Sequence, residues 1–229
     1  MTDVAVVAGA SQGIGAATTQ RLAADGYHVI AAARSGDKLE RVAASHVQIT
    51  PVVADVASDE DVERLLRSAT DAGRLTAWVN TAATLRNVPF DLLDTAVWRA
   101  VLDVSLDGTF RCCRAAYRAM AASGGGTIVN IASLSGVQNV EKFPGLAAYN
   151  VAKAGVIALS EAVALEGRDN GVRCICVSPG AVDTEMLRAA NPSLRPGMTA
   201  EDAAAIIAWL LTPEAAPLSG SNIPIFSNA

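Results

Sequence analysis

The chain has 229 residues, of which 51% are hydrophobic and only 4% aromatic, and its formal net charge is −5. This length suits one large α/β domain with a full hydrophobic core, so we expect a single domain over residues 1–229. The absence of a basic cluster excludes nucleic acid and anionic membranes as partners. Apolar runs are strand-length, shorter than the ~20 residues of a membrane span. We recognise no signal peptide and expect a cytoplasmic protein.

Four cysteines are present, but neither pair has the spacing of a zinc or redox motif. Cys112 and Cys113 are adjacent in an expected helix, whereas Cys174 and Cys176 alternate along an expected strand. We interpret all four as small apolar side chains in a reducing compartment. The sequence predicts no metal site.

Strand and helix patterns alternate to the end of the chain. The expected strands are 4–8, 29–33, 47–53, 77–80, 127–131, 172–177 and 223–226, and the expected helices are 14–24, 38–44, 60–69, 95–121 with a break at Gly108, 148–166 and 200–211. Solid apolar strands are buried on both faces, which is typical of a parallel sheet. The pattern predicts an α/β fold with one Rossmann-type, doubly wound sheet of about seven strands and helices on both faces. Two irregular stretches, 139–145 and 187–197, should lie at the ligand-binding edge.

A glycine-rich turn follows the first expected strand and opens the first helix. Glycines let the backbone approach a pyrophosphate, and the helix N-terminus supplies N–H donors. The outer glycines are six positions apart, unlike the G-x-G-x-x-G pattern, so a tight turn without a ligand is the alternative. The residues expected to bind a nucleotide here are Gly9, Ser11, Gln12, Gly13, Ile14 and Gly15.

Arg34 follows the second expected strand, where an acidic residue would bond the ribose 2′-hydroxyl of NAD. With no carboxylate expected at that spot, its guanidinium can bind a phosphate through two hydrogen bonds. Arg34 therefore favours NADP(H), with NAD(H) as a further option. The alternative is a solvated arginine at the end of a strand.

Tyr149 and Lys153 are four positions apart in an expected helix and share one face. An ammonium near a phenol lowers the phenol pKa towards neutrality, so Tyr149 can exchange a proton with a substrate oxygen. Ser133 lies just past the strand 127–131, where its hydroxyl can donate to the same oxygen. Taken alone, the Tyr149–Lys153 pair is also typical of an exposed amphipathic helix.

Taken together and in this order, these motifs resemble the short-chain dehydrogenase/reductase family in its compact single-domain branch. The resemblance covers nearly the whole chain and implies direct hydride transfer between a nicotinamide and a C=O or CH–OH carbon. Its motifs are Gly9-x-x-x-Gly13-x-Gly15, Asp55-Val56, Asn80-Thr81-Ala82-Ala83, Ser133, Tyr149-x-x-x-Lys153 and Pro179-Gly180-x-Val182-x-Thr184.

The resemblance also implies a role for each matched residue. Asp55 would accept from the adenine amino group, Asn80 would line the riboses, and Lys153 would hold the nicotinamide ribose hydroxyls. Thr184 would bind the carboxamide. Besides the glycine turn, the cofactor-binding residues would be Arg34, Asp55, Val56, Asn80, Ala82, Tyr149, Lys153, Pro179, Gly180, Val182 and Thr184.

Three departures from the family pattern stand out. Ala8 replaces a threonine, and Asn80-Thr81-Ala82-Ala83 replaces an Asn-Asn-Ala-Gly motif, and both changes are expected to be absorbed by local repacking. The fourth catalytic residue of the family is an asparagine, and we expect Asp103 in its place. Its charge near Lys153 would weaken the effect of the ammonium on Tyr149, and would either raise the optimum pH or slow the proton relay. The alternative is that Asp103 is a surface carboxylate.

The substrate side offers fewer signals. Ser135 is an alternative to Ser133 as the catalytic hydroxyl, but the Ser-x-x-Gly pattern favours Ser133. The segment from Ser133 to Tyr149 is about three residues longer than in the family, and we expect residues 141–143 to shape the substrate entrance. The lid after Thr184 is short, which suggests an open pocket.

The sequence favours an NADP(H)-dependent ketoreductase of the 3-oxoacyl or polyketide type, acting on a small-molecule carbonyl. The first alternative is an NAD-dependent dehydrogenase of a cyclic alcohol or dihydrodiol. A non-catalytic NADP-binding sensor or scaffold is a second, disfavoured by the intact Ser133, Tyr149 and Lys153. A nucleotide-sugar epimerase or dehydratase would need more than the 45 residues that follow Thr184. The resemblance implies a homo-oligomer, a tetramer or a dimer, with contacts around 115–122 and 156–164.

Overall fold

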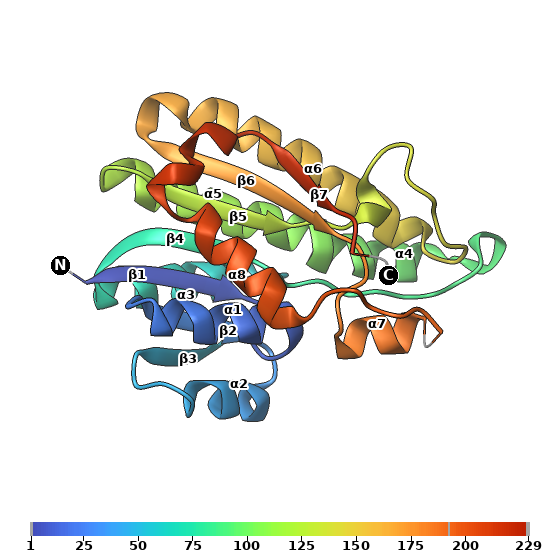
Figure 1. The fold of residues 1–229 in the computed structure, drawn as a ribbon, viewed down its shortest axis with the longest axis horizontal. Coiled ribbons are helices and arrows are strands. Elements are labelled where there is room, and N and C mark those ends of the chain that lie inside the picture. The colour runs from blue at the N-terminus through green and yellow to red at the C-terminus, as the bar shows by residue number, and fades with distance from the viewer. Residues whose placement is uncertain (1, 192, 228–229) are drawn as a thin grey trace.

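The computed structural model describes residues 2–191 and 193–227 and contains one sheet of seven parallel strands (Figure 1). The strands are β1 Asp3–Ala8, β2 His28–Ala33, β3 Ile49–Val53, β4 Arg74–Asn80, β5 Gly126–Ile131, β6 Val172–Pro179 and β7 Asn222–Ile225. Their order is β3-β2-β1-β4-β5-β6-β7. The chain adds strands outward on one side of β1 and then, from β4 on, outward on the other side. A ligand crevice is expected at the carboxyl ends of these two strands. The predicted Rossmann-type fold is confirmed.

Helices cover both faces of the sheet (Figure 1). Along β1, Val4 and Val6 pack into one core with α3, α5 and α6, whereas Ala5 and Val7 pack into the other with α1, α2 and α8. Burial of alternate side chains on opposite faces explains why this strand is a solid apolar run. The helices are α1 Gly13–Ala24, α2 Gly36–Ala43, α3 Asp59–Ala72, α4 Thr95–Leu102, α5 Gly108–Ala122, α6 Ala147–Gly167, α7 Glu185–Ala190 and α8 Ala200–Leu210.

Several elements differ from those expected, and β4, for example, begins three residues earlier, at Arg74. The third strand begins at Ile49, because Val47 is 99% exposed and lies in the preceding turn. The long helix is divided by a π-helical segment, Asp103–Asp107, immediately before the break expected at Gly108. A short helix, α7, occupies part of the stretch expected to be irregular.

The helical stretch Ala147–Asn170 is long and apolar enough to cross a membrane by length and composition alone, contrary to the expectation that no run approaches that length. In the fold, its main part, α6, packs along β6 and α5, and it carries the buried Tyr149 and Lys153. This packing is that of a core helix in a layered α/β protein.

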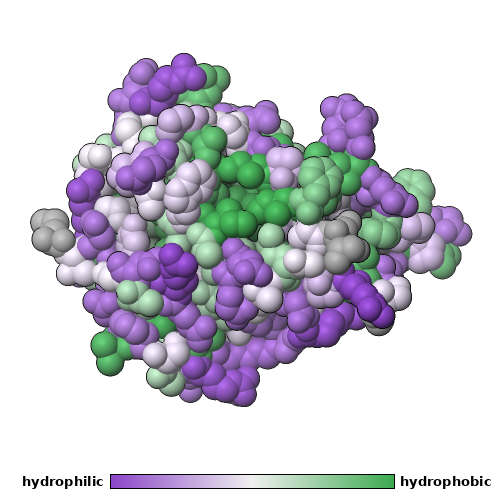
Figure 2. Space-filling view, viewed as in Figure 1, coloured by the Kyte–Doolittle hydropathy of each residue, from purple (hydrophilic) through white to green (hydrophobic). Residues whose placement is uncertain are grey.

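The four cysteines are free and buried, as expected. The alanine-rich faces expected to form subunit contacts are partly internal, since Ala115, Ala116 and Ala164 are buried in the core. Figure 2 shows apolar side chains gathered on the face that carries α8 and β7. Trp209 of α8 and Phe226 after β7 are both at least half exposed.

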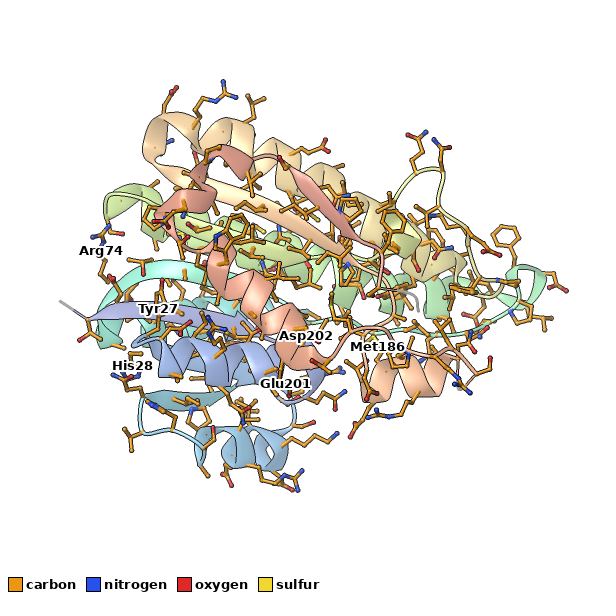
Figure 3. All side chains as sticks on the ribbon, in the orientation of Figure 1. Tyr27, His28, Arg74, Met186, Glu201 and Asp202 are labelled. Carbon is orange, nitrogen blue, oxygen red and sulfur yellow. The ribbon has the colours of Figure 1, made fainter. Side chains whose placement is uncertain are left out.

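The two edges of the sheet differ in content. Tyr27, His28 and Arg74 lie at the amino edge, where β2 and β4 begin, and Met186 of α7 lies beyond the opposite, carboxyl edge (Figure 3). The glycine turn, Ser133 and Pro179-Gly180 all follow strand ends at this carboxyl edge. The topology therefore gathers the predicted site residues at one edge.

Candidate active site

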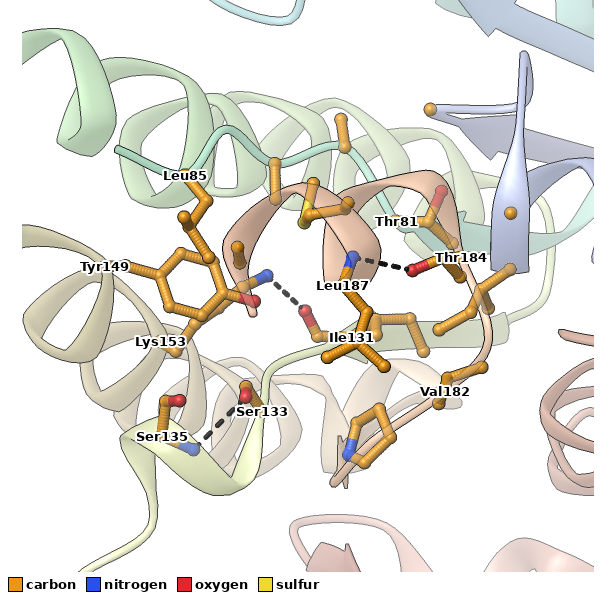
Figure 4. A pocket seen from close by; sticks show the side chains of 18 of the residues that line it. Thr81, Leu85, Ile131, Ser133, Ser135, Tyr149, Lys153, Val182, Thr184 and Leu187 are labelled. Carbon is orange, nitrogen blue, oxygen red and sulfur yellow. Dashed lines mark hydrogen bonds between the residues drawn. The ribbon is translucent and has the colours of Figure 1, made fainter. Parts of the chain in front are cut away.

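A cavity of about 690 Å³ lies at the carboxyl edge of the sheet (Figure 4). Of the predicted site residues, only Asn80 and Asp103 are absent from its lining. The predicted residues that line it are Gly9, Ser11, Gln12, Gly13, Ile14, Gly15, Arg34, Asp55, Val56, Ala82, Ser133, Tyr149, Lys153, Pro179, Gly180, Val182 and Thr184. Motifs from six strand ends, those of β1 to β6, thus meet around one space.

Two glycines of the turn lie too close to neighbouring backbone to be replaced by residues with side chains. Gly9 has a φ of +93°, and a Cβ there would lie 2.5 Å from the Ala82 nitrogen. A Cβ on Gly15 would lie 2.1 Å from the Gly9 oxygen. Helix α1 begins at Gly13, and the side chain of its N-cap residue, Gln12, forms no capping hydrogen bond. The first-turn N–H groups and the positive end of the helix dipole therefore face the cavity.

Two departures from the family pattern meet in this turn. The Thr81 hydroxyl donates a 2.8 Å hydrogen bond to the carbonyl oxygen of Ala8, which also accepts from the Thr81 N–H at 2.8 Å. Both bonds join the end of β1 to the end of β4. In place of the family residues, a side-chain hydrogen bond thus connects the two strands that flank the crevice.

Arg34 lies at the cavity wall with its side chain 65% exposed. Contrary to expectation, a carboxylate lies near it, because Asp55 Oδ2 is 3.8 Å from Arg34 Nη1. The other Asp55 oxygen accepts a hydrogen bond from the Ala57 N–H at 3.0 Å. The guanidinium remains accessible to an incoming anion, but part of its charge is already offset.

Ser133 is held at the start of a 3-10 turn, Leu134–Gly136, that follows β5. Its Oγ accepts a 3.1 Å hydrogen bond from the Ser135 N–H (Figure 4). The hydroxyl proton of Ser133 is therefore available to the Tyr149 oxygen, with which Ser133 forms a hydrogen bond, or to a ligand oxygen. The 3-10 turn packs against α6, since a Cβ on Gly136 would lie 2.5 Å from the Lys153 carbonyl carbon.

Tyr149 and Lys153 project from α6 into the cavity, with exposed fractions of 9% and 2%. Lys153 Nζ donates a 2.6 Å hydrogen bond to the Ile131 carbonyl oxygen and lies 5.7 Å from the centre of the Tyr149 ring. Burial lowers the pKa of Lys153 to about 8. This ammonium is thus poised to lose its proton just above neutral pH.

The predicted lowering of the Tyr149 pKa is not found. Burial raises the pKa of the phenol to about 12, and its hydrogen bond with Ser133 only partly offsets this effect. The physical reason is that desolvation penalises the phenolate, while the Lys153 ammonium is directed to the Ile131 carbonyl. Tyr149 is therefore a protonated phenol at neutral pH, which can donate to a ligand oxygen.

Helix α7 also lines the cavity, through Glu185, Met186, Leu187 and Ala190. Thr184 caps its N-terminus and touches the glycine turn, since a Cβ on Gly13 would lie 3.0 Å from Thr184 Cγ2. Lys38 Nζ also joins the two sides, with a 2.7 Å bond to Gln12 Oε1 and a 3.0 Å ion pair with Glu185. The short lid is thus fastened directly to the glycine turn.

Asn80 does not line the cavity, contrary to the role expected from the resemblance. Its side chain is 4% exposed, accepts a 2.9 Å bond from Trp78 Nε1 and donates a 2.8 Å bond to Asn130 Oδ1. Asn130 in turn donates to the Ser160 hydroxyl at 2.9 Å. This buried network holds β4 to β5 and to α6, so Asn80 supports the site from below.

Asp103 also lies outside the cavity. Its side chain is 47% exposed and forms a 3.0 Å ion pair with Arg111. The inward-facing polar residue of the π-helical segment is Ser105, which is fully buried. Its Oγ accepts a 3.0 Å bond from the Thr84 N–H and lies 3.2 Å from the Thr84 carbonyl, to which it donates. Helical spacing from the buried Val101 would have favoured Ser105 over Asp103.

The substrate end of the cavity was only partly predicted. Glu141 and Phe143 line it as expected. The other lining residues come from the segment after β4, from the extended loop before α6, and from α7. They include Leu85, Asn87, Val140, Pro144, Leu146, Met186 and Leu187. No motif singles them out, because isolated side chains in loops, or in a helix of six residues, form no periodic pattern.

The described residues contain no cluster of three or more His, Cys, Asp or Glu side chains suited to a metal ion. A family model described as short chain dehydrogenase matches residues 3–195. The chain belongs to the short-chain dehydrogenase family. It is therefore an NAD(P)-dependent dehydrogenase or reductase.

Similar proteins include several short-chain dehydrogenases of nearly the same length. An acetoacetyl-CoA reductase of Allochromatium vinosum is 34% identical, with 98% of this chain and 97% of the relative covered. The 3beta-hydroxysteroid dehydrogenase 1 of Eggerthella lenta is also 34% identical, with coverage of 95% and 90%. The structure of a point variant of the actinorhodin polyketide ketoreductase with NADPH superposes with a TM-score of 0.89 at 26% identity, covering 98% of this chain and 95% of that one.

The geometry fits the nicotinamide dinucleotide that short-chain dehydrogenases use. Gly9 and Gly15 let the turn pack closely against neighbouring backbone, and α1 begins at Gly13 with an N-terminus suited to a pyrophosphate. Arg34 and Asp55 lie at one end of the same cavity, and Ser133, Tyr149 and Lys153 lie at the other. An extended ligand can therefore contact the phosphate-binding turn and the acid/base residues together.

Proposed function

We propose that this protein is an NADP(H)-dependent ketoreductase that converts a ketone into a secondary alcohol. The observation that carries the proposal is the shared position of two hydroxyl donors, Ser133 and Tyr149, in one cavity with the buried ammonium of Lys153. Tyr149 retains its proton at neutral pH, since burial raises its pKa to about 12. A protonated phenol favours the direction in which the carbonyl oxygen receives a proton.

A nicotinamide held by the turn from Gly9 to Gly15 and by Thr184 would supply the hydride for the carbonyl carbon. Ser133 and Tyr149 donate hydrogen bonds to the carbonyl oxygen and so favour the negative charge that develops there. The Tyr149 proton passes to this oxygen as the C–H bond forms, which leaves an alcohol and a phenolate. The Lys153 ammonium stabilises that phenolate, and solvent then returns the proton.

Arg34 supports NADP(H) as the preferred cofactor. Its guanidinium is exposed at the cavity wall, and the Ser35 side chain at the start of α2 forms no capping hydrogen bond. Both groups are suited to a 2′-phosphate. The Asp55 carboxylate, 3.8 Å from Arg34, works against this preference, so NAD(H) is the alternative cofactor.

Among ketones, the 3-oxoacyl or polyketide class is our first proposal, in line with the acetoacetyl-CoA reductase and the polyketide ketoreductase. A cyclic alcohol is the second candidate. It is favoured by the apolar lining of Leu85, Val140, Phe143 and Leu146, and by the likeness to the hydroxysteroid dehydrogenase. We further propose that the 229 residues act as one domain and assemble as a homo-oligomer.

The first experiment is a fluorescence titration of the purified protein with NADPH and NADH, followed by a panel of ketones with the preferred cofactor. We expect tighter NADPH binding that weakens at least tenfold in Arg34→Ala. Equal affinities in the wild type would remove the argument from Arg34 and raise the NAD-dependent alternative. Tight binding without turnover of any ketone would favour the non-catalytic alternative.

The acid/base assignment is tested in the same assay. Tyr149→Phe keeps the ring and removes the proton donor, so kcat should fall by roughly 10²–10⁴ with cofactor affinity retained. Ser133→Ala should also lower kcat, whereas Ser135→Ala should leave it within a few fold. The reverse order for the two serines would transfer the role of Ser133 to Ser135.

A further inference from the structure

The extended loop before α6, residues 137–146, forms one wall at the substrate end of the cavity. Five of its residues line the cavity, namely Val140, Glu141, Phe143, Pro144 and Leu146. Four of these are apolar, so the wall offers contact area to the carbon skeleton of a substrate. Its position relative to Ser133 and Tyr149 decides which ketones fit between them.

The side chain of Lys142 ties the middle of this loop to its N-terminal start. Lys142 Nζ donates a 3.2 Å hydrogen bond to the Leu134 carbonyl oxygen and a second bond to that of Val137. Leu134 belongs to the 3-10 turn that begins at Ser133. Among the described residues, Lys142 has no ion pair, so its charge is directed to these two carbonyls. The neighbouring Glu141 faces the cavity instead.

The C-terminal end of the loop, at Gly145, and its turn at Asn139 are fixed by the backbone. The Val88 N–H donates a 2.9 Å bond to the Gly145 oxygen. Gly145 has a φ of +81°, and a Cβ there would lie 2.0 Å from Asn87 Oδ1. Asn139 has a φ of +60°, the only positive value at a non-glycine position in the described residues. With both ends held and a left-handed tip, the loop has one defined path.

We propose that Lys142 is a positioning residue that holds loop 137–146 as a fixed wall and thereby determines substrate size selection. The inference rests on the proposed ketone reduction at Ser133 and Tyr149. The turn that carries Ser133 has further anchors of its own, the Ser135 N–H bond and the contact of Gly136 with α6. Loss of Lys142 therefore affects substrate binding more than the chemical step.

The test compares Lys142→Met, which keeps the length but removes the donors, with Lys142→Arg, which keeps a cationic donor. Arg67→Met, at an exposed position on α3, serves as the matched control for loss of a surface cation. The substrates are a bicyclic ketone and butanone, each with saturating NADPH. In Lys142→Met we expect at least a fivefold rise in KM for the bicyclic ketone, less than a twofold change for butanone, and kcat within twofold. Lys142→Arg should restore the KM.

Hydrogen exchange of the NADPH-bound enzyme provides a measurement independent of activity. The backbone amides of residues 138–143, 145 and 146 should exchange at least fivefold faster in Lys142→Met and at an unchanged rate in Arg67→Met. Unchanged exchange would overturn the proposal, as would faster exchange with an unaltered KM for the bicyclic ketone, because the loop would then not select. If the wild type reduces neither ketone, the proposed function fails, while the exchange rates still decide whether Lys142 holds the loop.

Discussion

The backbone of Gly136 lies directly against Lys153, where a Cβ at position 136 would approach the Lys153 carbonyl carbon to 2.5 Å. Gly136 ends the turn that carries Ser133, and Lys153 lies one helical turn after Tyr149. The contact joins the turn that follows β5 to helix α6, which leads into β6. The relative position of the Ser133 and Tyr149 hydroxyls therefore depends on an absent side chain.

Gly136→Ala should separate these two hydroxyls. The added methyl meets backbone atoms of α6, which cannot rotate away, so the turn must move outward. A shift of about 1 Å can cost about 10²-fold in rate, and we expect a loss of that order in kcat for ketone reduction. Cofactor affinity, measured by fluorescence titration, should change less than threefold. A variant with normal kcat would mean that the turn adjusts without moving Ser133.

Lys153 should give the enzyme a characteristic dependence on pH. Because protonated Lys153 stabilises the Tyr149 phenolate, kcat/KM for reduction should be level below pH 8 and fall above it, following the Lys153 pKa of about 8. A fall centred near pH 10.5 would show that burial does not lower the pKa of Lys153. Steady-state rates with one ketone between pH 6 and 10 make the measurement.

The same shift has a consequence for stability. The folded pKa of Lys153 is about 8, against its usual 10.5. Between these values the unfolded chain binds more protons, so the contribution of Lys153 to stability improves as pH rises from 8 to 10.5. Lys153→Met should be inactive yet about 1–3 kcal/mol more stable than the wild type at pH 7, with the difference shrinking towards pH 10. Urea unfolding at both pH values tests this, and a less stable variant at pH 7 would contradict it.

We expect Ser105 to matter more than Asp103 for stability and for substrate binding, the reverse of what the sequence suggested. Ser105→Ala leaves the Thr84 N–H and carbonyl without their buried partner, which costs about 1–3 kcal/mol of stability and should raise KM by loosening the cavity wall at Leu85. Asp103→Asn disturbs only an exposed ion pair, worth about 0–1 kcal/mol. Urea unfolding and KM measurements on both variants decide between them. A larger effect of Asp103→Asn would restore its predicted role.

The Lys38–Glu185 ion pair should slow the release of cofactor. Both side chains are partly exposed, so the pair contributes about 0.2–1 kcal/mol, and Lys38→Met should speed NADPH dissociation by about two- to fivefold in stopped flow. Glu185→Gln should have a similar effect, and the double variant should add little. At 1 M salt, where the Debye length is about 3 Å, the difference should disappear. Additive effects would show that the two residues act separately.

The sheet, its helices and most of the cavity lining could be predicted because they depend on chain direction. Gly9, Ser133 and Thr184 each follow a strand, and parallel strands bring their carboxyl ends together. The roles of Asn80 and Asp103 and the pKa of Tyr149 could not be predicted, since they depend on where a side chain points and on how much water surrounds it. Packing of the folded chain directs Ser105 into the core. The same packing buries Tyr149 and so raises its pKa.

The tie between Thr81 and Ala8 limits how this family member can evolve. The Thr81 hydroxyl occupies the space next to the glycine turn, so that a Cβ on either Gly9 or Gly15 would lie 2.6 Å from it. Backbone atoms are closer still, since the Ala82 nitrogen would lie 2.5 Å from a Cβ on Gly9 and the Gly9 oxygen 2.1 Å from a Cβ on Gly15. Loss of the Thr81 hydroxyl would therefore not free either glycine to change, whereas position 81 can vary only among side chains that fit beside the turn.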